Sequence, residues 1–245
     1  MQIDTKQHTV NIFVPCFVDQ FFPNTGINLV NVLSNVGCSV NYNVEQTCCG
    51  MPAFQDGFWD HSRDVAKKLI NEYDDSNSVV CIDGACSAMV KKSYTELFKE
   101  DILQHEVKKF QKRFFEFSDF MVNELGVTDV NAVLEAKAVY MDACKAVNAC
   151  GIYEQPRKLL ANVRGLKLIE LNDDTCCGFG GTFAAENADF SDVLATSKAD
   201  LIYKSGAEVA ISSDMSCLYH VQQQMKGIDP SIRFMHIVDV LAQKK

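Results

Sequence analysis

Thr47-Cys48-Cys49-Gly50 and Thr175-Cys176-Cys177-Gly178 are the same four residues, repeated 128 positions apart. The match extends outward from this motif, because Cys16 and Cys144 are separated by the same 128 positions. Eleven cysteines scattered at random over 245 residues would give about 0.2 matched pairs at this offset, whereas the chain has three. The sequence is therefore a tandem duplication of one cysteine-rich unit.

A fourth cysteine completes each copy. Asp83-x-x-Cys86 recurs as Asp214-x-x-Cys217, 131 positions later, so the second copy carries a three-residue insertion. We expect a first domain with a connector at residues 1–125 and a second domain at residues 126–245. The candidate metal ligands form two quartets: Cys16, Cys48, Cys49 and Cys86, then Cys144, Cys176, Cys177 and Cys217. The unmatched Cys38, Cys81 and Cys150 are expected to be small buried hydrophobic residues.

Short apolar runs alternate with segments of helical spacing along both halves. The runs predict strands at 10–15, 40–44, 79–82, 138–141, 166–171, 209–212 and 232–236. Helices are predicted at 25–36, 60–73, 87–98, 155–163, 191–204 and 218–225. The alternation favours an α/β fold: two tandem related α/β domains, each with a mostly parallel sheet flanked by helices. Residues 102–125 have apolar side chains at helical spacing and are predicted to form a helical connector.

The matched cysteines fall at the predicted ends of strands. Cys16 and Cys144 follow the first strand of each half, and Cys86 and Cys217 lie where a strand gives way to a helix. The carboxyl ends of parallel strands form the ligand crevice of open α/β sheets. A helix N-terminus also favours a thiolate over a thiol. We therefore expect each quartet to converge at such an edge, with sulfurs ready to bind metal.

Glycines accompany the adjacent cysteines. Two neighbouring cysteines cannot both point to one face of a strand, so both pairs are predicted in irregular loops. Gly50 and Gly178 permit such loops, and the Gly178-Phe179-Gly180-Gly181 run would let the backbone approach a bound group with its N–H groups directed at sulfur. The candidate cofactor-binding residues are therefore Gly50, Gly178, Gly180 and Gly181.

Spacing alone leaves three kinds of site open. An iron–sulfur cluster is favoured, because neighbouring thiolates can bind different irons while two distant cysteines complete the set. A zinc ion also accepts four thiolates, but its usual pair of short C-x2–4-C hooks is missing from this sequence. A thiol–disulfide enzyme that uses the adjacent pair ranks lowest, since a vicinal disulfide is strained.

Composition excludes several other roles. A formal net charge of −9 disfavours nucleic acid and anionic membrane surfaces as partners. We identify no transmembrane segment and no apolar signal core near the N-terminus, so a cytoplasmic protein is expected. A reducing compartment would not maintain disulfides among eleven cysteines, which again points to metal binding.

These motifs resemble a known family. The two Cys-Cys-Gly modules, and above all the run from Cys176 to Phe183, resemble the cysteine-rich CCG-domain iron–sulfur subunit of the L-lactate utilisation complex. That family is related to glycolate-oxidase iron–sulfur subunits and, more distantly, to the cysteine-rich subunit of heterodisulfide reductase. The resemblance implies one or two iron–sulfur clusters, of the 4Fe-4S type, in a subunit that carries electrons from a 2-hydroxy acid. It also implies two partners: a ferredoxin-like iron–sulfur subunit and a third subunit.

The chain departs from its distant relatives at defined positions. Heterodisulfide reductase ends each module with Cys-x-x-Cys, where this chain has Asp83 and Asp214 in the first place, leaving four sulfurs per module. The lactate-utilisation relatives place histidines around the first cysteine of the second module, where this chain has Met141 and Lys145. No nicotinamide or flavin fingerprint is recognised, so we expect an oxidoreductase subunit that works only within a complex, with its catalytic residues unassigned.

Overall fold

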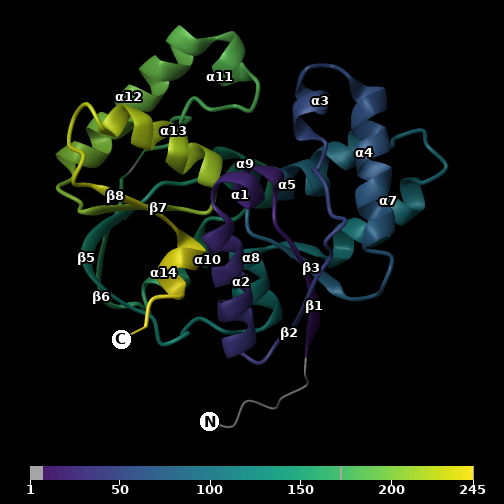
Figure 1. The fold of residues 1–245 in the computed structure, drawn as a ribbon, viewed down its shortest axis with the longest axis horizontal. Helices are drawn as coiled ribbons and strands as arrows, with labels where there is room; N and C mark the ends of the chain where they lie inside the picture. Colours follow the sequence, from purple (N-terminus) through teal and green to yellow (C-terminus); the bar gives the residue numbers. More distant parts are fainter. Residues whose placement is uncertain (1–7, 172, 245) are drawn as a thin grey trace.

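A computed structural model describes residues 8–171 and 173–244. Two four-stranded sheets lie side by side, with strand orders β2-β1-β3-β4 and β6-β5-β7-β8 (Figure 1). Every strand pair within both sheets is parallel. The two orders are identical when β1 is matched with β5 and each later strand with its counterpart. The predicted fold class, two tandem related α/β units, is therefore confirmed.

The strands of the two sheets have these bounds: β1 Thr9–Phe13, β2 Ser39–Tyr42, β3 Ser78–Cys81, β4 Phe114–Glu116, β5 Val133–Tyr140, β6 Arg164–Ile169, β7 Val209–Ser212 and β8 Arg233–His236. Alternate residues of β1 face different cores: Ile12 belongs to the large core and Phe13 to a smaller one. Burial on both faces explains why the central strands β3 and β7 are mostly apolar.

Helices of the first half are α1 Cys16–Phe21, α2 Pro23–Asn35, α3 Met51–Gln55, α4 Trp59–Glu72, α5 Gly84–Ala88, the π-helix η1 Met89–Ser93, α6 Tyr94–Leu97, α7 Gln104–Arg113, α8 Phe117–Asp119 and the π-helix η2 Phe120–Glu124. Those of the second half are α9 Cys144–Cys150, α10 Glu154–Leu160, α11 Phe183–Glu186, α12 Ala188–Lys204, α13 Met215–Met225 and α14 Ile237–Leu241. The short helices α1 and α9 begin at equivalent cysteines, Cys16 and Cys144.

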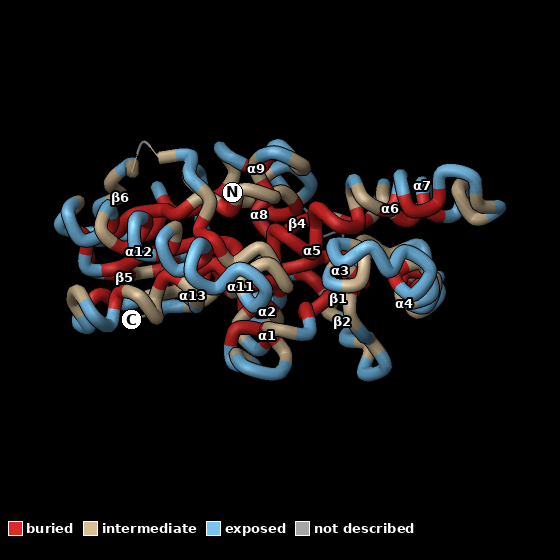
Figure 2. Tube along the Cα trace, turned by 90° about the horizontal axis from the view of Figure 1, so that it is seen from above, coloured by how far each residue is buried: buried red, intermediate tan, exposed pale blue. Residues whose placement is uncertain are grey.

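The two halves share one hydrophobic core. Residues of both sheets belong to it, and α5 is buried along its length, whereas α4 and α12 carry many exposed residues (Figure 2). Polar contacts also join the halves, because Thr25 and Asn28 on α2 both donate to the carboxylate of Asp239 on α14, at 2.9 Å each. The modules are thus one packed unit.

The predicted helical connector at 102–125 is wrong in one respect. It contains α7, then strand β4, which pairs with β3 as the fourth strand of the first sheet, and then α8 and η2. The phenylalanines at 110, 114 and 117 are buried, which accounts for their regular spacing in the sequence. That spacing did not reveal the short strand between the helices. The predicted division between residues 125 and 126 stays a prediction.

Candidate metal centre

The first quartet comes from three separate elements. Cys16 begins α1, Cys48 and Cys49 lie in the loop between β2 and α3, and Cys86 lies in the first turn of α5. The Sγ atoms of Cys16 and Cys48 are 3.8 Å apart, and those of Cys49 and Cys86 are 3.2 Å apart. Cys16 is exposed, whereas Cys49 and Cys86 are buried. The quartet therefore has one edge at the surface and a buried interior.

The second quartet repeats this arrangement. Cys144 begins α9, its Sγ lies 4.0 Å from that of Cys176, and Cys217 lies in the first turn of α13. All four of its cysteines line one cavity of about 90 Å³. The two predicted quartets are thus each brought together by the fold. Among residues 8–171 and 173–244, no three His, Cys, Asp or Glu side chains already form a single-ion site.

Left-handed glycines shape both Cys-Cys loops. Gly50 has φ +83° and Gly178 has φ +87°, a region that side-chain-bearing residues rarely adopt. Each of these glycines directs its N–H at the first sulfur of its pair, at 3.4 Å from Cys48 Sγ and from Cys176 Sγ. Gly180 and Gly181 also have positive φ and line the cavity of the second quartet. The irregular loops and the N–H to sulfur contacts predicted from the sequence are present.

A buried serine holds each glycine in place. Ser62 Oγ donates to the carbonyl oxygen of Gly50 at 2.9 Å, and Ser191 Oγ donates to that of Gly178 at 2.7 Å. Both serines are fully buried. In the second half, His220 Nε2 also lies 2.8 Å from Ser191 Oγ. Sequence reasoning missed this pair, although the serines are 129 positions apart, one residue from the cysteine offset.

Two aspartates orient the last cysteine of each quartet. Asp83 accepts hydrogen bonds from the N–H groups of Ala85 and Cys86, and Asp214 accepts from those of Ser216 and Cys217. These residues occupy the positions where the distant relatives carry a further cysteine. Here they act as N-caps, satisfying the first N–H groups of α5 and α13.

The same aspartates meet at the boundary between the halves. Asp214 Oδ2 lies 3.2 Å from the N–H of Ala85 in the other half, and Gly84 N–H donates to the carbonyl oxygen of Ser213 at 3.1 Å. Burial, together with the charge of Asp214, raises the pKa of Asp83 well above its ordinary value. The two carboxyl groups therefore connect the two quartets through one polar contact region.

Sulfur acidity follows the duplication. The hydrogen bond from Cys16, followed by that from Cys49, lowers the pKa of Cys48 to about 3. Cys144 and then Cys177 act in the same way on Cys176, lowering its pKa to about 2. Each half thus has one sulfur poised as a thiolate at the equivalent position.

The expected effect of the helix N-terminus on Cys86 and Cys217 is not observed. Hydrogen bonds from Cys49 and Cys177 lower their pKa values, but burial and the negative charges of Asp83 and Asp214 together outweigh these bonds and raise both pKa values to about 11. In a low-dielectric interior the cost of an uncompensated thiolate exceeds the favourable helix dipole. A bound cation would supply the missing compensation.

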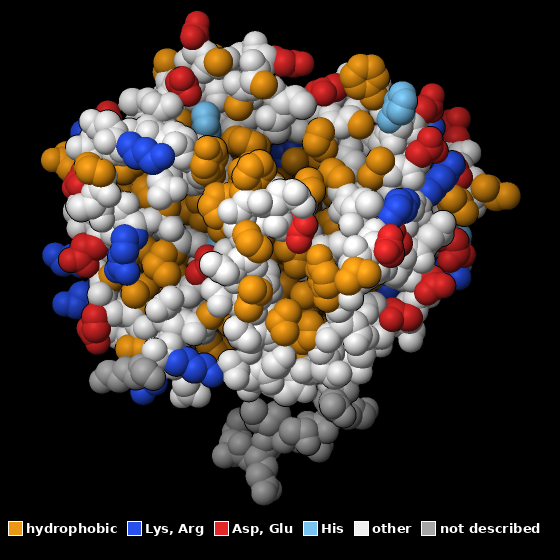
Figure 3. Space-filling model, viewed as in Figure 1, with side chains coloured by type: hydrophobic (Ala, Val, Ile, Leu, Met, Phe, Trp, Pro, Cys, Tyr) orange, Lys and Arg blue, Asp and Glu red, His pale blue; other side chains and the backbone are white. Residues whose placement is uncertain are grey.

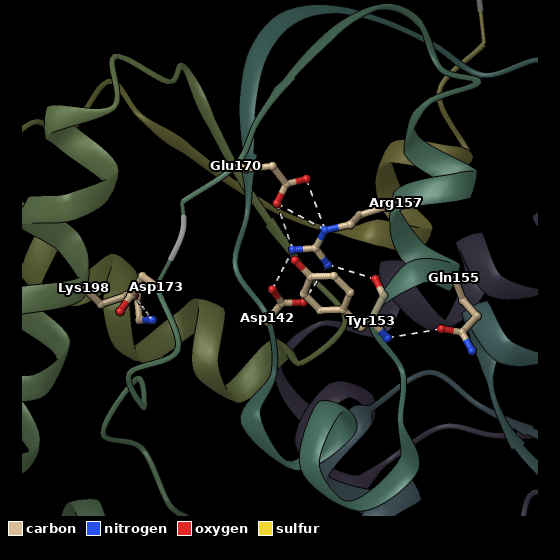
Figure 4. A network of polar contacts seen from close by, with 7 residues as sticks. All are labelled: Asp142, Tyr153, Gln155, Arg157, Glu170, Asp173 and Lys198. Atoms are coloured by element: carbon tan, nitrogen blue, oxygen red, sulfur yellow. Dashed lines mark hydrogen bonds and ion pairs between the residues drawn. The ribbon is translucent and has the colours of Figure 1, made fainter.

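A charged network secures the strand end that leads to Cys144. Arg157 lies between Asp142 and Glu170, with Nη2 2.7 Å from Asp142 Oδ2 and 3.0 Å from Glu170 Oε2 (Figure 4). Its guanidinium lies over the ring of Tyr153, 3.7 Å from the centroid. These residues border a cavity of about 420 Å³ that reaches Cys144. Because Arg157 is neutralised by two carboxylates, we assign the network a structural role.

Aromatic side chains surround α1 beside the exposed Cys16. Phe17 contacts the rings of Phe22, Phe179 and Tyr219, with centroid distances of 5.8, 5.8 and 5.9 Å. Hydrophobic side chains gather near the centre of this face of the molecule (Figure 3). The first quartet therefore opens onto an apolar surface.

The remaining predictions concern the other cysteines and membrane insertion. Cys38 and Cys81 are buried, as predicted, but Cys150 is only half-buried. All eleven cysteines are free thiols.

None of the helices in the described part of the chain has the length and apolarity needed to cross a membrane.

Fold and site together define a duplicated α/β protein that presents one sulfur quartet per unit. Residues 10–91 and 138–222 match the family described as "Cysteine-rich domain" (CCG), and the chain belongs to this family. The resemblance inferred from the sequence motifs is confirmed.

Curated relatives match over almost the full length. "Lactate utilization protein A" of Bacillus subtilis (strain 168) is 37% identical over 234 residues, covering 95% of this chain and 98% of that protein. The protein of the same name from Exiguobacterium sp. (strain ATCC BAA-1283 / AT1b) is 38% identical over 236 residues, covering 95% and 96%. "Lactate utilization protein A 2" of Bacillus cereus (strain 03BB102) is 35% identical over 236 residues, covering 96% and 98%.

Proposed function

We propose that this chain is an iron–sulfur electron-transfer subunit of a cytoplasmic oxidoreductase complex that oxidises L-lactate or a related 2-hydroxy acid such as glycolate. The observation that carries the proposal is the convergence of four cysteines, from distant parts of the sequence, in each half of the duplicated fold. The names of the relatives, which refer to lactate utilisation, support the choice of substrate.

The residues present suit an iron–sulfur cluster. Iron–sulfur clusters are held by cysteine thiolates, and hydrogen bonds to their sulfurs tune them. Each half offers four thiols, one of which has a strongly lowered pKa. Gly50 and Gly178 already direct N–H groups at sulfur. When bound, a cluster of the 4Fe-4S type would supply one-electron transfer; the chain itself supplies the ligands and excludes water from the buried sulfurs.

The complex would also need other subunits. We infer a ferredoxin-like iron–sulfur subunit as the electron-transfer partner and a third subunit. The chain's own contribution is to hold the two centres beside one interface, where α5 meets the second half.

Iron counting tests the proposal. Full-length protein purified anaerobically should be brown and contain iron and acid-labile sulfide, and Cys86→Ser and Cys217→Ser should each remove a comparable share of the iron. Cys38→Ser, which alters a buried cysteine outside both quartets, is the matched control and should retain the iron of the unsubstituted protein. Protein that stays colourless and free of iron after anaerobic reconstitution would contradict the proposal.

Two other functions make different predictions. A zinc-stabilised interaction module would contain stoichiometric zinc and no reducible chromophore. A thiol–disulfide oxidoreductase would use Cys48 or Cys176, whose lowered pKa values suit a nucleophile as well as a metal ligand. Rapid alkylation at one of these two cysteines, in protein that never takes up iron, would favour the thiol–disulfide oxidoreductase.

A further inference from the structure

A single lysine lines the cavity of the second quartet. Lys145 directly follows Cys144 in α9 and is half-buried. Among the residues that form the cavity of about 90 Å³, it is the one with a cationic side chain. Met51, from the other half, closes the cavity beside it. The ammonium group therefore lies where the second quartet faces the first module.

The hydrogen-bonding capacity of Lys145 is largely unused. Its Nζ donates to the sulfur of Met51 at 3.3 Å. A thioether is a weak acceptor, and an ammonium group has three donors. The salt bridges found among residues 8–171 and 173–244 do not include this lysine. A small anion would be a stronger partner for it than Met51.

Backbone donors lie in the same cavity. Gly180 and Gly181 line it with φ values of +55° and +69°. Within the described part of the chain, the hydrogen bonds outside regular helices and strands include none donated by these two N–H groups. The same cavity is lined by Asp214, whose carboxylate already accepts hydrogen bonds from the N–H groups of Ser216, Cys217 and Ala85. One cationic side chain and two backbone N–H groups thus remain as donors, and charge-assisted hydrogen bonds of this kind suit a carboxylate.

The duplication provides an internal comparison. The residue equivalent to Lys145 in the first half, 128 positions earlier, is Phe17. Phe17 packs against Phe179 and Tyr219 instead of providing a charge. The two quartets therefore differ in the chemistry beside their first cysteine: apolar in the first half and cationic in the second.

We propose that Lys145, with the backbone of Gly180 and Gly181, binds the carboxylate of a small carboxylic acid at the second quartet, the chemical class being a 2-hydroxy acid or its 2-oxo product. The inference rests on the proposed function for the identity of that class. It assigns ligand contact to the second centre and leaves the first as a carrier site. Lys145 contributes charge and hydrogen bonds to the carboxylate, and no bond is made or broken at this residue.

Ligand titration of the cluster-loaded full-length chain tests this assignment. L-lactate, pyruvate and acetate are each added at constant ionic strength while the visible and electron paramagnetic resonance spectra are recorded. Saturable spectral change is expected, and Lys145→Gln should raise the half-saturating concentration about 10-fold or more, equivalent to about 1.4 kcal/mol. Lys145→Arg, which keeps the charge, should retain most of the affinity. Lys158→Gln, at an exposed lysine of α10, is the matched control and should behave as the unsubstituted chain.

The three acids distinguish the source of the carboxylate. A response to lactate alone identifies the hydroxy acid as the ligand, and a response to pyruvate alone identifies the oxo acid. An equal response to acetate would mean that the site binds carboxylates in general and is not selective for this class. The last outcome would overturn the assignment of class. Unchanged half-saturation in a loaded Lys145→Gln protein would overturn the role of Lys145, while the intact cluster would leave the proposed function standing.

A second measurement does not require a cluster. In the metal-free full-length chain, alkylation by anionic iodoacetate is compared with alkylation by neutral iodoacetamide at each cysteine. We expect the iodoacetate to iodoacetamide rate ratio at Cys144 and Cys176 to fall several-fold in Lys145→Gln and to stay constant at Cys16 and Cys48. A ratio unaffected at all four cysteines would show that Lys145 attracts no carboxylate. If the chain fails to load iron, the proposed function is refuted, but the alkylation ratio can still be measured and still tests the role of Lys145.

Discussion

Glu116 gives a quantitative prediction about the pH dependence of stability. It ends β4, is only 1% exposed, and caps α8 by accepting hydrogen bonds from the N–H groups of Ser118 and Asp119, at 2.8 and 3.2 Å. Its other oxygen, Oε1, has no hydrogen-bond partner among the described residues. Burial, despite these hydrogen bonds, raises the pKa of Glu116 to about 7. The folded protein therefore holds a proton that the unfolded chain releases.

The sign and size of the effect follow from proton linkage. Because the folded state binds the proton more tightly, the stabilisation is complete below about pH 4.5 and is lost as the pH rises through about 7. With an unfolded pKa of 4.5 and a folded pKa of about 7, the free energy of unfolding should fall by about 2.5 kcal/mol between about pH 5 and about pH 8. Glu116→Gln keeps an acceptor at the cap but has no proton to lose.

Urea unfolding of the metal-free full-length chain at these two pH values measures the difference. Relative to Glu116→Gln, the unsubstituted protein should lose about 2.5 kcal/mol on going to the higher pH. Glu124→Gln, at an exposed glutamate of η2, is the control and should keep the pH dependence of the unsubstituted chain. The reasoning is refuted if Glu116→Gln and the unsubstituted protein show parallel pH dependences.

Two further predictions concern the glycine–serine support of the Cys-Cys loops, both measured by urea unfolding. Gly178→Ala should lower the free energy of unfolding by more than about 2 kcal/mol, because a Cβ there would lie 2.5 Å from the carbonyl oxygen of Ser191. Gly206→Ala is the control, since Gly206 is also left-handed but has open space around it, and it should cost only about 1 kcal/mol. Equal losses at the two positions would contradict the steric argument. Ser62→Ala should lower the free energy of unfolding by about 1 kcal/mol, because its buried hydrogen bond to Gly50 is lost. Ser191→Ala should lower it by more, because His220 also loses a hydrogen-bond partner. A smaller loss at Ser191 than at Ser62 would show that His220 contributes nothing.

The sequence predicted the sheets well because their signals are local. The run 209–212, for example, has three apolar residues followed by Ser212, lies between polar turns, and forms a strand with those bounds. Strand β4 was missed because Phe110, Phe114 and Phe117 are spaced as on one helical face, and because the buried end of the strand is a glutamate. Three residues cannot establish a period of two against a longer helical pattern.

The cysteine quartets were predictable for a different reason. Because the chain is duplicated, equivalent cysteines are separated by a constant number of residues, and this offset can be read from the sequence. Ser62 and Ser191 could have been found by the same comparison with an offset of one more residue. The contact between Asp214 and the N–H of Ala85 could not, because it depends on how α5 packs against the second half. The pKa values of Cys86 and Cys217 were also mispredicted, since burial is a tertiary property that a helix start does not reveal.

The packing at that boundary argues that the two modules fold as one unit. A side chain at Gly84 would meet the Cβ of Ala146 at 2.8 Å, so α5 approaches α9 as closely as glycine allows. Separation of the halves would leave buried Asp83 and Asp214 without the groups that now surround them and would expose the shared core. The cysteine that ends the first quartet lies in α5, and the cysteine that begins the second lies in α9. The same close packing that joins the modules therefore fixes the separation of the two sulfur sites. Under the proposed function, electron exchange between them would need no movement of one module relative to the other.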